Sequence, residues 1–129
     1  MSNVYLDSSA LTKLVIDEPE SPSLLTVVQG RSLMTSRVAV VEVSKSVARS
    51  NPVADPSKIL SLVTVLELDP DVASVAATTG GPGLRTLDAI HVATALLVGA
   101  ELESFITYDT RQSEAASAAG LHVIAPGAD

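Results

Sequence analysis

The chain contains no cysteine and almost no aromatic side chains. Cysteine and tryptophan are absent from its 129 residues, and aromatic residues make up only 2% of them. The absence of cysteine excludes disulfide bonds and metal sites built on thiolates. Aliphatic residues and alanine supply the hydrophobic content of 47%, and the mean hydropathy of +0.38 is high for a water-soluble chain.

Basic residues are also scarce. Lys and Arg number 8 against 15 Asp and Glu, which gives a formal net charge of −7 at pH 7. A protein that coats nucleic acid non-specifically is expected to be basic, so this class is disfavoured. A polyanionic substrate would need bound cations and a local basic strip, because the net charge does not attract it. Six of the basic residues lie in the first 58 residues: Lys13, Arg31, Arg37, Lys45, Arg49 and Lys58.

The sequence also lacks a long hydrophobic run. The longest apolar stretch, AIHVATALLVGA at residues 89–100, contains His91 and Thr94 and is too short to span a bilayer. The first residues lack the basic, apolar and small-residue regions of a signal peptide. We therefore expect a cytoplasmic protein that does not contact a membrane.

Strand-like and helix-like segments alternate along a chain whose length suits a single domain, residues 1–129. Strands separated by helices predict a three-layer α/β/α domain around a parallel sheet. The expected strands lie within residues 3–6, 32–36, 63–69, 104–109 and 121–124. The expected helices cover residues 9–16, 23–30, 37–50, 55–63, 71–80, 87–100 and 110–120, with Pro19 and Pro22 before the second helix.

A carboxylate follows the first expected strand. In VYLDSSALTKL, residues 4–14, an apolar run ends at Asp7, and Ser8 or Ser9 is expected to cap the next helix. In open α/β sheets, ligands bind at the carboxyl ends of the strands. Asp7 is therefore a candidate site residue, although an aspartate at this position also suits a simple helix cap.

The segment SFITYD repeats this pattern, since Asp109 follows an apolar strand and precedes a helix. If the two strands are neighbours, the carboxylates of Asp7 and Asp109 lie roughly 5 Å apart at one edge of the sheet. Carboxylates that close repel each other, so that one of them needs a proton or a cation. The repetition favours a functional interpretation of both residues.

Two further acids admit both a structural and a functional interpretation. Asp88 lies in the first turn of the apolar helix, after Thr86 as the expected N-cap, and the helix dipole favours an acid there. Glu42 shares one helix side with Lys45 and Arg49, which is typical of a solvated stripe. If that side faces a cleft, Glu42 instead holds cations, and Lys45 and Arg49 contact a phosphate backbone.

These acids together form a set of hard oxygen ligands. Such a set, without cysteine, suits Mg²⁺ or Mn²⁺ rather than zinc. One or two such ions activate water and stabilise the leaving oxygen when a phosphodiester bond is hydrolysed. The candidate catalytic and metal-binding residues are Asp7, Glu42, Asp88 and Asp109.

Four segments resemble, in order, the motifs of PIN-domain ribonucleases, and most closely those of VapC-type toxins of bacterial toxin–antitoxin pairs. They are VYLDSSALTKL, SRVAVVEVSKSV, LRTLDAIHVATAL and TYDTRQSEAASAAGLHVI. The resemblance covers nearly the whole chain, and residues 84–95 are its most specific part. It implies a five-stranded sheet of order 3-2-1-4-5, and it implies that the four acids hold Mg²⁺ or Mn²⁺ and cut single-stranded or looped RNA.

The resemblance also implies a homodimer and a small antitoxin whose tail covers the acidic site. A chain of this hydropathy is expected to expose apolar patches that a partner buries. Two segments, around residues 19–28 and 59–63, supply candidate side chains for these patches: Leu24, Leu25, Val28, Ile59 and Leu62.

Several residues near the acids have weaker assignments. Thr107 precedes Asp109 by two residues and is positioned to orient it or a catalytic water, although a strand threonine needs no such role. His91 is expected to be a packed or orienting residue rather than a base. Arg85 either meets phosphate or pairs with an acid. Some PIN relatives carry an acid or amide just after the last aspartate, which leaves the role of Gln112 open.

Three other functions are weighed against a ribonuclease. A phospho-acceptor receiver domain needs an acid pair near its first strand and a late lysine, and no lysine follows Lys58. A phosphatase that begins with Asp-x-Asp is disfavoured, because Ser9 occupies the place of the second acid. A catalytically inactive PIN fold that binds RNA or protein is the remaining alternative, and the intact set of four acids speaks against it.

Overall fold

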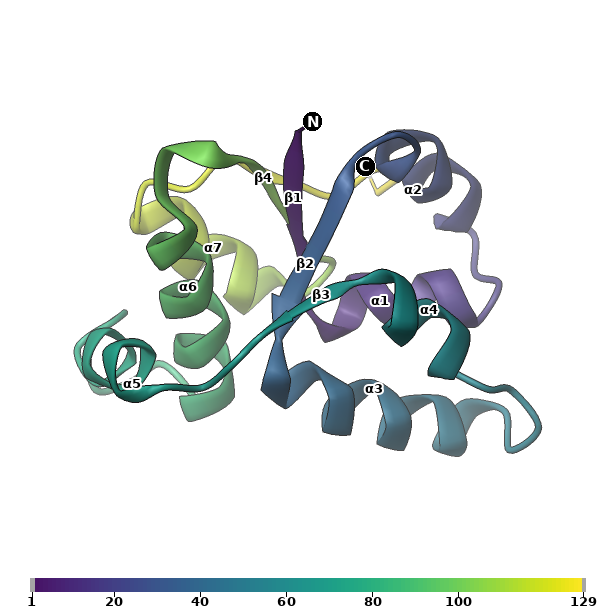
Figure 1. The fold of residues 1–129 in the computed structure, drawn as a ribbon, viewed down its shortest axis with the longest axis horizontal. Coiled ribbons are helices and arrows are strands. Elements are labelled where there is room, and N and C mark those ends of the chain that lie inside the picture. Colours follow the sequence, from purple (N-terminus) through teal and green to yellow (C-terminus); the bar gives the residue numbers. More distant parts are fainter. Residues whose placement is uncertain (1, 129) are drawn as a thin grey trace.

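In the computed structural model, which describes residues 2–128, helices follow strands along most of the chain (Figure 1). The strands are β1 (Asn3–Leu6), β2 (Ser32–Ser36), β3 (Thr64–Leu66), β4 (Leu102–Ile106) and β5 (Val123–Ile124). The helices are α1 (Ser8–Val15), α2 (Ser21–Val28), α3 (Arg37–Ser50), α4 (Ser57–Leu62), α5 (Pro70–Ala76), α6 (Thr86–Val98) and α7 (Thr110–Ala118). A short 3₁₀ helix, Gly99–Glu101, precedes β4. Every expected helix and strand is present.

The strands form one parallel sheet in the order β3-β2-β1-β4-β5. The order 3-2-1-4-5 and the α/β/α class are therefore confirmed. The central strand β1 pairs with β4, and Leu6 lies opposite Ile106 at the end of this ladder. Because parallel strands end at the same edge, the residues that follow β1 and β4 lie side by side there.

Different helices cover the two faces of the sheet, because successive side chains of a strand point to opposite faces. On β1, Val4 and Leu6 pack in one core with residues of α1, α2 and α3. Tyr5 packs on the other face, with Val92 of α6 and with Phe105. Figure 1 shows the first group of helices on one side of the sheet and α6 and α7 on the other.

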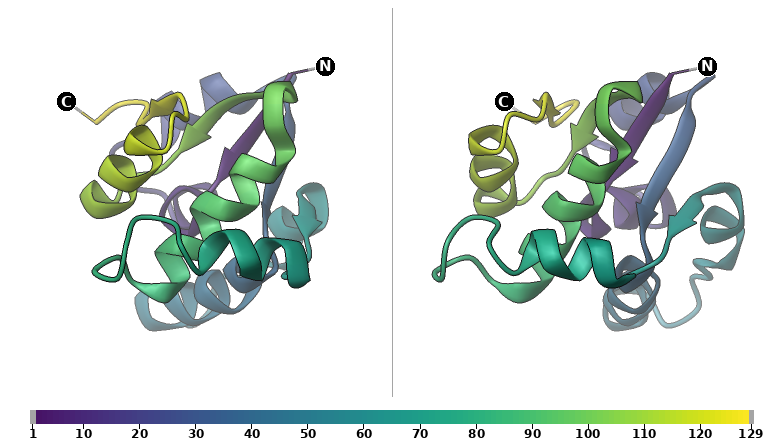
Figure 2. Two further views of the ribbon diagram at one scale, coloured as in Figure 1. Left: turned by 90° about the vertical axis from the view of Figure 1, so that its left-hand side faces the viewer. Right: turned by 60° about the vertical axis from the view of Figure 1, so that its left-hand side comes forward.

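Helix α6 is buried through its middle. Seven consecutive residues, from Ala89 to Ala95, are buried. The helix packs on the sheet with Val92 and Ala95, while Ile90 and Ala93 pack against Val72 of α5. Figure 2 shows α5 lying across the outer side of α6. Contacts with the sheet on one side and with α5 on the other explain why the sequence of α6 is apolar nearly all round. The N-terminus of α6 lies towards the carboxyl edge of the sheet.

The predicted start of α1 needs correction. Asp7, not Ser8 or Ser9, is the N-cap, and its Oδ1 accepts a hydrogen bond from the Ala10 amide. The aspartate side chain is long enough to reach that amide from the extended backbone at the end of β1. Ser8 and Ser9 lie inside the helix, and their hydroxyl groups are available for other partners.

Other element boundaries also differ from the predictions. Thr86 is the first residue of α6 rather than its cap, and Arg85 precedes it without a capping hydrogen bond. Pro22 lies within the first turn of α2, where a missing N–H costs nothing. Helix α5 already ends at Ala76, and β4 ends at Ile106 rather than continuing to the aspartate.

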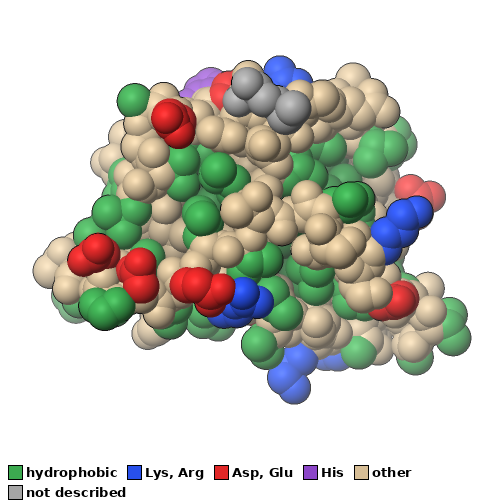
Figure 3. Space-filling model, viewed as in Figure 1, with side chains coloured by type: hydrophobic (Ala, Val, Ile, Leu, Met, Phe, Trp, Pro, Cys, Tyr) green, Lys and Arg blue, Asp and Glu red, His purple; other side chains and the backbone are tan. Residues whose placement is uncertain are grey.

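Charged side chains are unevenly spread over the surface. Figure 3 shows acidic side chains gathered over α5 and the segment that leads to it, and Lys or Arg side chains over α3 and α4.

Among residues 2–128, no helix has the length and apolar character needed to cross a membrane.

Candidate active site

Asp7 lies at the centre of a hydrogen-bond cluster at the carboxyl edge of the sheet. Its side chain is buried, with 3% of the residue exposed. Oδ1 accepts from the Ser9 hydroxyl at 2.6 Å and from the Ala10 amide at 3.1 Å, and Oδ2 accepts from the Thr107 hydroxyl at 2.5 Å. Burial raises the pKa of Asp7, although His91 and these hydrogen bonds partly oppose that effect. A cation beside Asp7 would relieve this unfavourable burial of charge.

Thr107 connects Asp7 to Asp109. Its Oγ1 donates to Asp7 and accepts a hydrogen bond from the Asp109 amide at 3.1 Å. Asp109 is half-buried and caps α7, since its Oδ1 accepts from the Gln112 amide at 3.1 Å. The expected juxtaposition of the ends of β1 and β4 is therefore present, and the Thr107 hydroxyl is hydrogen-bonded to both aspartates.

Glu42 does not belong to a solvated stripe. Its side chain is 26% exposed, and Oε1 accepts from the Ser8 hydroxyl at 2.9 Å and lies 2.7 Å from Nε2 of His91. Burial acts to raise the pKa of Glu42, but the contacts with His91 and Ser8 outweigh it and lower the pKa. Glu42 is therefore a carboxylate held by Ser8 and His91 rather than an exposed member of the helix side that carries Lys45.

Asp88 reaches the same region from α6. It precedes His91 by three residues, so the two side chains share a helix face, and His91 contacts Glu42. Oδ2 of Asp88 is buried and accepts no hydrogen bond from the described residues. Its nearest cation is Nε of the exposed Arg85, at 3.4 Å, so Arg85 pairs with an acid. An incompletely satisfied carboxylate oxygen of this kind suits an additional ligand.

A cleft of about 440 Å³ lies beside Glu42. Arg49 and Lys13 bring positive charge to it, and Tyr108 forms part of its wall. A place for Lys13 in this cleft was not predicted from the sequence. Its Nζ forms ion pairs with Oε1 of Glu20 at 2.8 Å and Oε1 of Glu18 at 3.3 Å. Glu18 also lines the cleft, and the remaining lining residues are Ser8, Ser9, Thr12 and Ser46.

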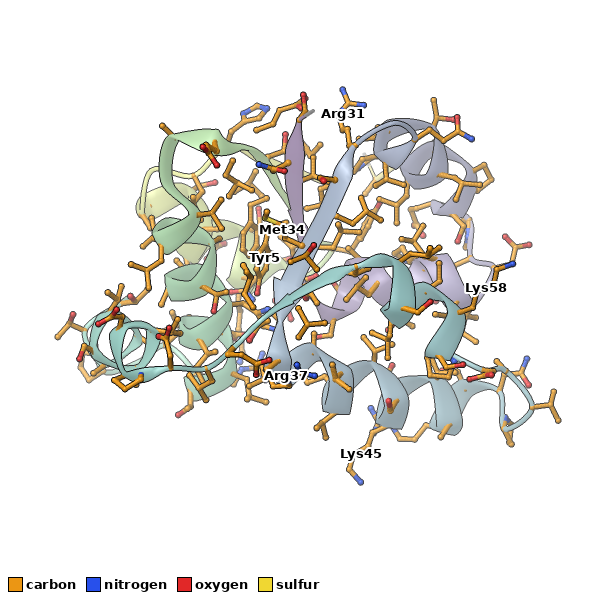
Figure 4. The ribbon with its side chains drawn as sticks, viewed as in Figure 1. Tyr5, Arg31, Met34, Arg37, Lys45 and Lys58 are labelled. Carbon is orange, nitrogen blue, oxygen red and sulfur yellow. The ribbon has the colours of Figure 1, made fainter. Side chains whose placement is uncertain are left out.

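Lys45 does not line this cleft. Figure 4 shows its side chain extending from α3 away from the rest of the molecule. On an α-helix, position 45 is turned about 60° from position 42, whereas position 49 is turned only about 20°. The structure thus separates two residues that the sequence pattern had grouped, and Arg49 is the one that lies with Glu42.

The four acids approach one edge but do not form a closed metal site. Across residues 2–128, no three His, Asp or Glu side chains are near enough to one another to hold a metal ion as they stand. The donor chemistry nevertheless fits Mg²⁺ or Mn²⁺, since every candidate offers carboxylate oxygen. The buried Oδ2 of Asp88 and the raised pKa of Asp7 both indicate an environment that a cation would stabilise.

Ser8, Ser9 and Tyr5 make contacts near the acids that were not predicted from the sequence. Ser8 and Ser9 donate to Glu42 and Asp7, and the Tyr5 hydroxyl lies 2.6 Å from Nδ1 of His91. A serine pair directly after Asp7 was the available signal, but it also fits a helix cap. Nothing in the local sequence indicates the Tyr5–His91 contact, because the two residues are 86 positions apart.

Comparison with known proteins shows the family of the chain and relatives of its fold. A family model described as "PIN domain" matches residues 4–118. The chain is 40% identical over 131 residues to "Ribonuclease VapC35" of Mycobacterium tuberculosis, covering 96% of this chain and 97% of that protein. The fold is similar to that of Mycobacterium tuberculosis VapC20, described as a sarcin–ricin loop cleaving toxin, with a TM-score of 0.70 and 16% identity, covering 95% of this chain and 99% of the other. A chain of a toxin–antitoxin complex from Klebsiella pneumoniae has a similar fold, with a TM-score of 0.71 and 23% identity, covering 95% of this chain and 97% of the other.

Proposed function

Because this chain belongs to the PIN-domain family, we propose that it is a metal-dependent endoribonuclease toxin that hydrolyses phosphodiester bonds of cellular RNA and is neutralised by an antitoxin. The observation that carries the proposal is the cluster at the carboxyl edge of the sheet, where Thr107 joins Asp7 to Asp109 and Glu42 faces a cleft. The similarity to a protein named as a ribonuclease supports the same chemistry. We propose that the chain acts on RNA in the cytoplasm.

We assign the metal to the four acids. Asp7, Glu42, Asp88 and Asp109 would hold Mg²⁺ or Mn²⁺, which supplies activation of water and stabilisation of the leaving oxygen. The chain's own hydroxyl groups fix these carboxylates: Ser9 and Thr107 hold Asp7, and Ser8 holds Glu42. A carboxylate fixed before the substrate binds needs little reorganisation during the reaction.

The cleft beside Glu42 supplies the RNA-binding part of the proposal. Arg49 lines it and has no hydrogen bond or ion pair to the described residues, so that its guanidinium is available to a phosphate. Lys13 is partly neutralised by Glu18 and Glu20, and it lies 4.8 Å from the centre of the Tyr108 ring. We therefore assign Arg49 to the RNA backbone and give Lys13 a mainly structural role.

The partners of the chain form a second part of the proposal. Of the candidate patch residues, Leu25 and Leu62 are 50% and 66% exposed. Leu24 and Val28 lie in the core, and the partly buried Ile59 packs against it, so these three do not form a free patch. Leu25 lines a groove of about 330 Å³ between α1 and α2. We propose that a small antitoxin binds here and that its tail reaches the acids, and that two copies of the chain form a homodimer. A neighbour described as a toxin–antitoxin complex supports the first partner.

Mapping RNA ends tests the proposed function directly. The wild-type chain is expressed briefly in a bacterial host without its antitoxin, and new RNA 5′ ends are sequenced. We expect new ends and arrested growth with the wild type, and neither with Asp7→Asn or Asp88→Asn. A folded wild-type protein that produces no new ends, and cuts no RNA in Mg²⁺ or Mn²⁺, would favour the inactive binding module instead.

A further inference from the structure

A buried chain of hydrogen bonds runs from the sheet to Glu42 through α6. The Tyr5 hydroxyl on β1 lies 2.6 Å from Nδ1 of His91, and Nε2 of His91 lies 2.7 Å from Oε1 of Glu42. Tyr5 is fully buried and 1% of His91 is exposed. The proposed function assigns no role to Tyr5, and the sequence left open whether His91 is a packed or an orienting residue.

The chemistry of the acceptor sets the direction of these hydrogen bonds. A carboxylate only accepts, so Nε2 of His91 carries the proton that it donates to Glu42. In the neutral ring, Nδ1 is then the acceptor for the Tyr5 hydroxyl. The Tyr5 hydroxyl, as donor to Nδ1, thus favours the tautomer in which Nε2 carries the proton that Glu42 accepts.

The rest of the surroundings keeps the imidazole in place. The Tyr5 ring stacks on Phe105, with centroids 5.0 Å apart, and it meets the His91 ring edge-on at 5.8 Å. His91 is flanked on α6 by the buried residues Ile90 and Val92. A ring held on both nitrogens and on its edge has little freedom to release Glu42.

The two hydrogen bonds to Glu42 fall on the same oxygen. Oε1 accepts from both Ser8 and His91, while no described residue donates a hydrogen bond to Oε2. Glu42 also lines the cleft with Arg49. The carboxylate is therefore fixed through one oxygen, and the other remains available to a ligand.

We propose that His91, oriented by Tyr5, is a positioning residue that fixes Glu42 for cation binding and RNA cleavage. The proposal rests on the proposed function in assigning Glu42 to the metal. His91 touches neither substrate nor reacting atoms, and it acts only through Glu42. Residues that orient metal ligands in this way typically change metal affinity or activity by about 10- to 100-fold when they are replaced.

The test uses three variants of the full chain and one control. His91→Leu removes both ring nitrogens, His91→Gln retains a terminal N–H group that can donate to Glu42, and Tyr5→Phe removes only the hydroxyl. Thr94→Val is the matched control, because Thr94 is buried on the same helix but donates only to the Ile90 carbonyl, at 2.6 Å. Thermal unfolding of each variant accounts for simple loss of stability.

Mn²⁺ binding is measured by calorimetry without RNA, and kcat and KM are measured with RNA. We expect His91→Leu to weaken Mn²⁺ binding and lower kcat about tenfold with little change in KM. Tyr5→Phe should have the same effect but smaller, His91→Gln should restore most of the loss, and Thr94→Val should match the wild type.

The decisive comparison repeats the measurements in a Glu42→Gln background. If His91 acts through Glu42, His91→Leu changes Mn²⁺ affinity less than twofold there, because the interaction is already lost. The proposal is overturned if His91→Leu, or Tyr5→Phe where His91→Leu does not fold, has the same effect in both backgrounds or no effect in either. A chain that binds Mn²⁺ but cuts no RNA would defeat the proposed function and leave this calorimetric test intact.

Discussion

Oγ1 of Thr107 lies 2.5 Å from Oδ2 of Asp7, although the two residues are 100 positions apart. The same oxygen accepts from the Asp109 amide, so one hydroxyl group fixes the ends of two neighbouring strands. Both of its hydrogen-bonding roles depend on the oxygen, and the methyl group takes part in neither. This relationship predicts how the site responds to changes at position 107.

Thr107→Val should reduce RNA cleavage at least tenfold, whereas Thr107→Ser should retain most of it. Valine has a similar shape but leaves Asp7 and the Asp109 amide without their shared partner. Loss of a hydrogen bond to a charged group typically costs about 1.5–3 kcal/mol. Single-turnover cleavage and urea unfolding measure the two effects, and a valine variant that cuts at the wild-type rate would contradict this role.

Asp7 should make metal-free stability fall as pH rises. Burial raises its pKa in the folded chain above the ordinary value of 3.8, so the folded state holds the proton longer than the unfolded state. The free energy of unfolding therefore decreases between these two pKa values and stays lower above them. Asp7→Asn, which retains a good helix cap, should raise the Tm at pH 7 in EDTA and give no gain below pH 3.8.

Mg²⁺ or Mn²⁺ should stabilise the wild type at neutral pH. A ligand that binds only the folded state at 100 times its Kd adds about 2.7 kcal/mol. The increase in Tm should be largely lost in Asp7→Asn, and EDTA should abolish cleavage. Products should carry 5′-phosphate and 3′-hydroxyl ends, because water rather than the ribose 2′-hydroxyl attacks. Cyclic phosphate ends formed in EDTA would refute the metal-dependent mechanism.

Glu42→Gln should lose most RNA cleavage with little change in fold. The amide retains the shape of the side chain but not the negative charge needed for a cation. Glu67→Gln is the control, because Glu67 is exposed and forms an ion pair with Arg37. Such exposed pairs contribute about 0.2–1 kcal/mol to stability, so this control should cut RNA normally. Equal activity of the two variants would remove Glu42 from the site.

Arg49→Gln and Lys45→Gln should differ although each removes one positive charge from α3. Arg49 lines the cleft, whereas Lys45 points away from it. Arg49→Gln should raise KM for RNA and reduce the slope of log affinity against log salt by about 0.7, as expected for one lost contact to single-stranded phosphate. Lys45→Gln should change neither quantity. Identical slopes for the two variants would indicate long-range attraction only.

The two tyrosines should remain protonated above pH 10 while the chain is folded. Burial and the nearby Asp7 raise the pKa of Tyr5, and burial with Glu20 raises that of Tyr108 to about 12. The folded state therefore holds these protons longer than the unfolded state, and stability falls as pH rises above 10. Absorbance at 295 nm should change little from pH 9 to 10.5, and Tyr108→Phe isolates Tyr5. Titration near pH 10 in the folded chain would contradict this.

The sequence was sufficient to predict that the candidate acids Asp7 and Asp109 meet at one edge of the sheet. Asp7 and Asp109 each follow an apolar strand, and parallel strands bring such residues to one edge. Alternation of strands and helices likewise predicted the three layers. These inferences rest on patterns within short segments and on rules of sheet topology, which do not require knowledge of individual side-chain contacts.

The partners of the acids were less predictable. The contact of Glu42 with His91 joins residues 49 positions apart, and that of His91 with Tyr5 joins residues 86 apart. Helical spacing placed Lys45 on the same side of α3 as Glu42. The two positions differ by about 60° around the helix, which is enough for Glu42 to line the cleft while Lys45 points into solvent. Asp7 also proved to be both a helix cap and a site candidate, so the two interpretations do not exclude each other.

The place of β4 inside the sheet, between β1 and β5, has a consequence during protein synthesis. β4 pairs with β1, yet it is made after all but the last helix and strand of the described chain. A nascent chain that stops before it has neither Thr107 nor Asp109, and β1 has no neighbour on that side. Translation products that stop before β4 therefore carry only Asp7, Glu42 and Asp88 of the four acids, and the proposed site is assembled only after β4 and Asp109 have been made.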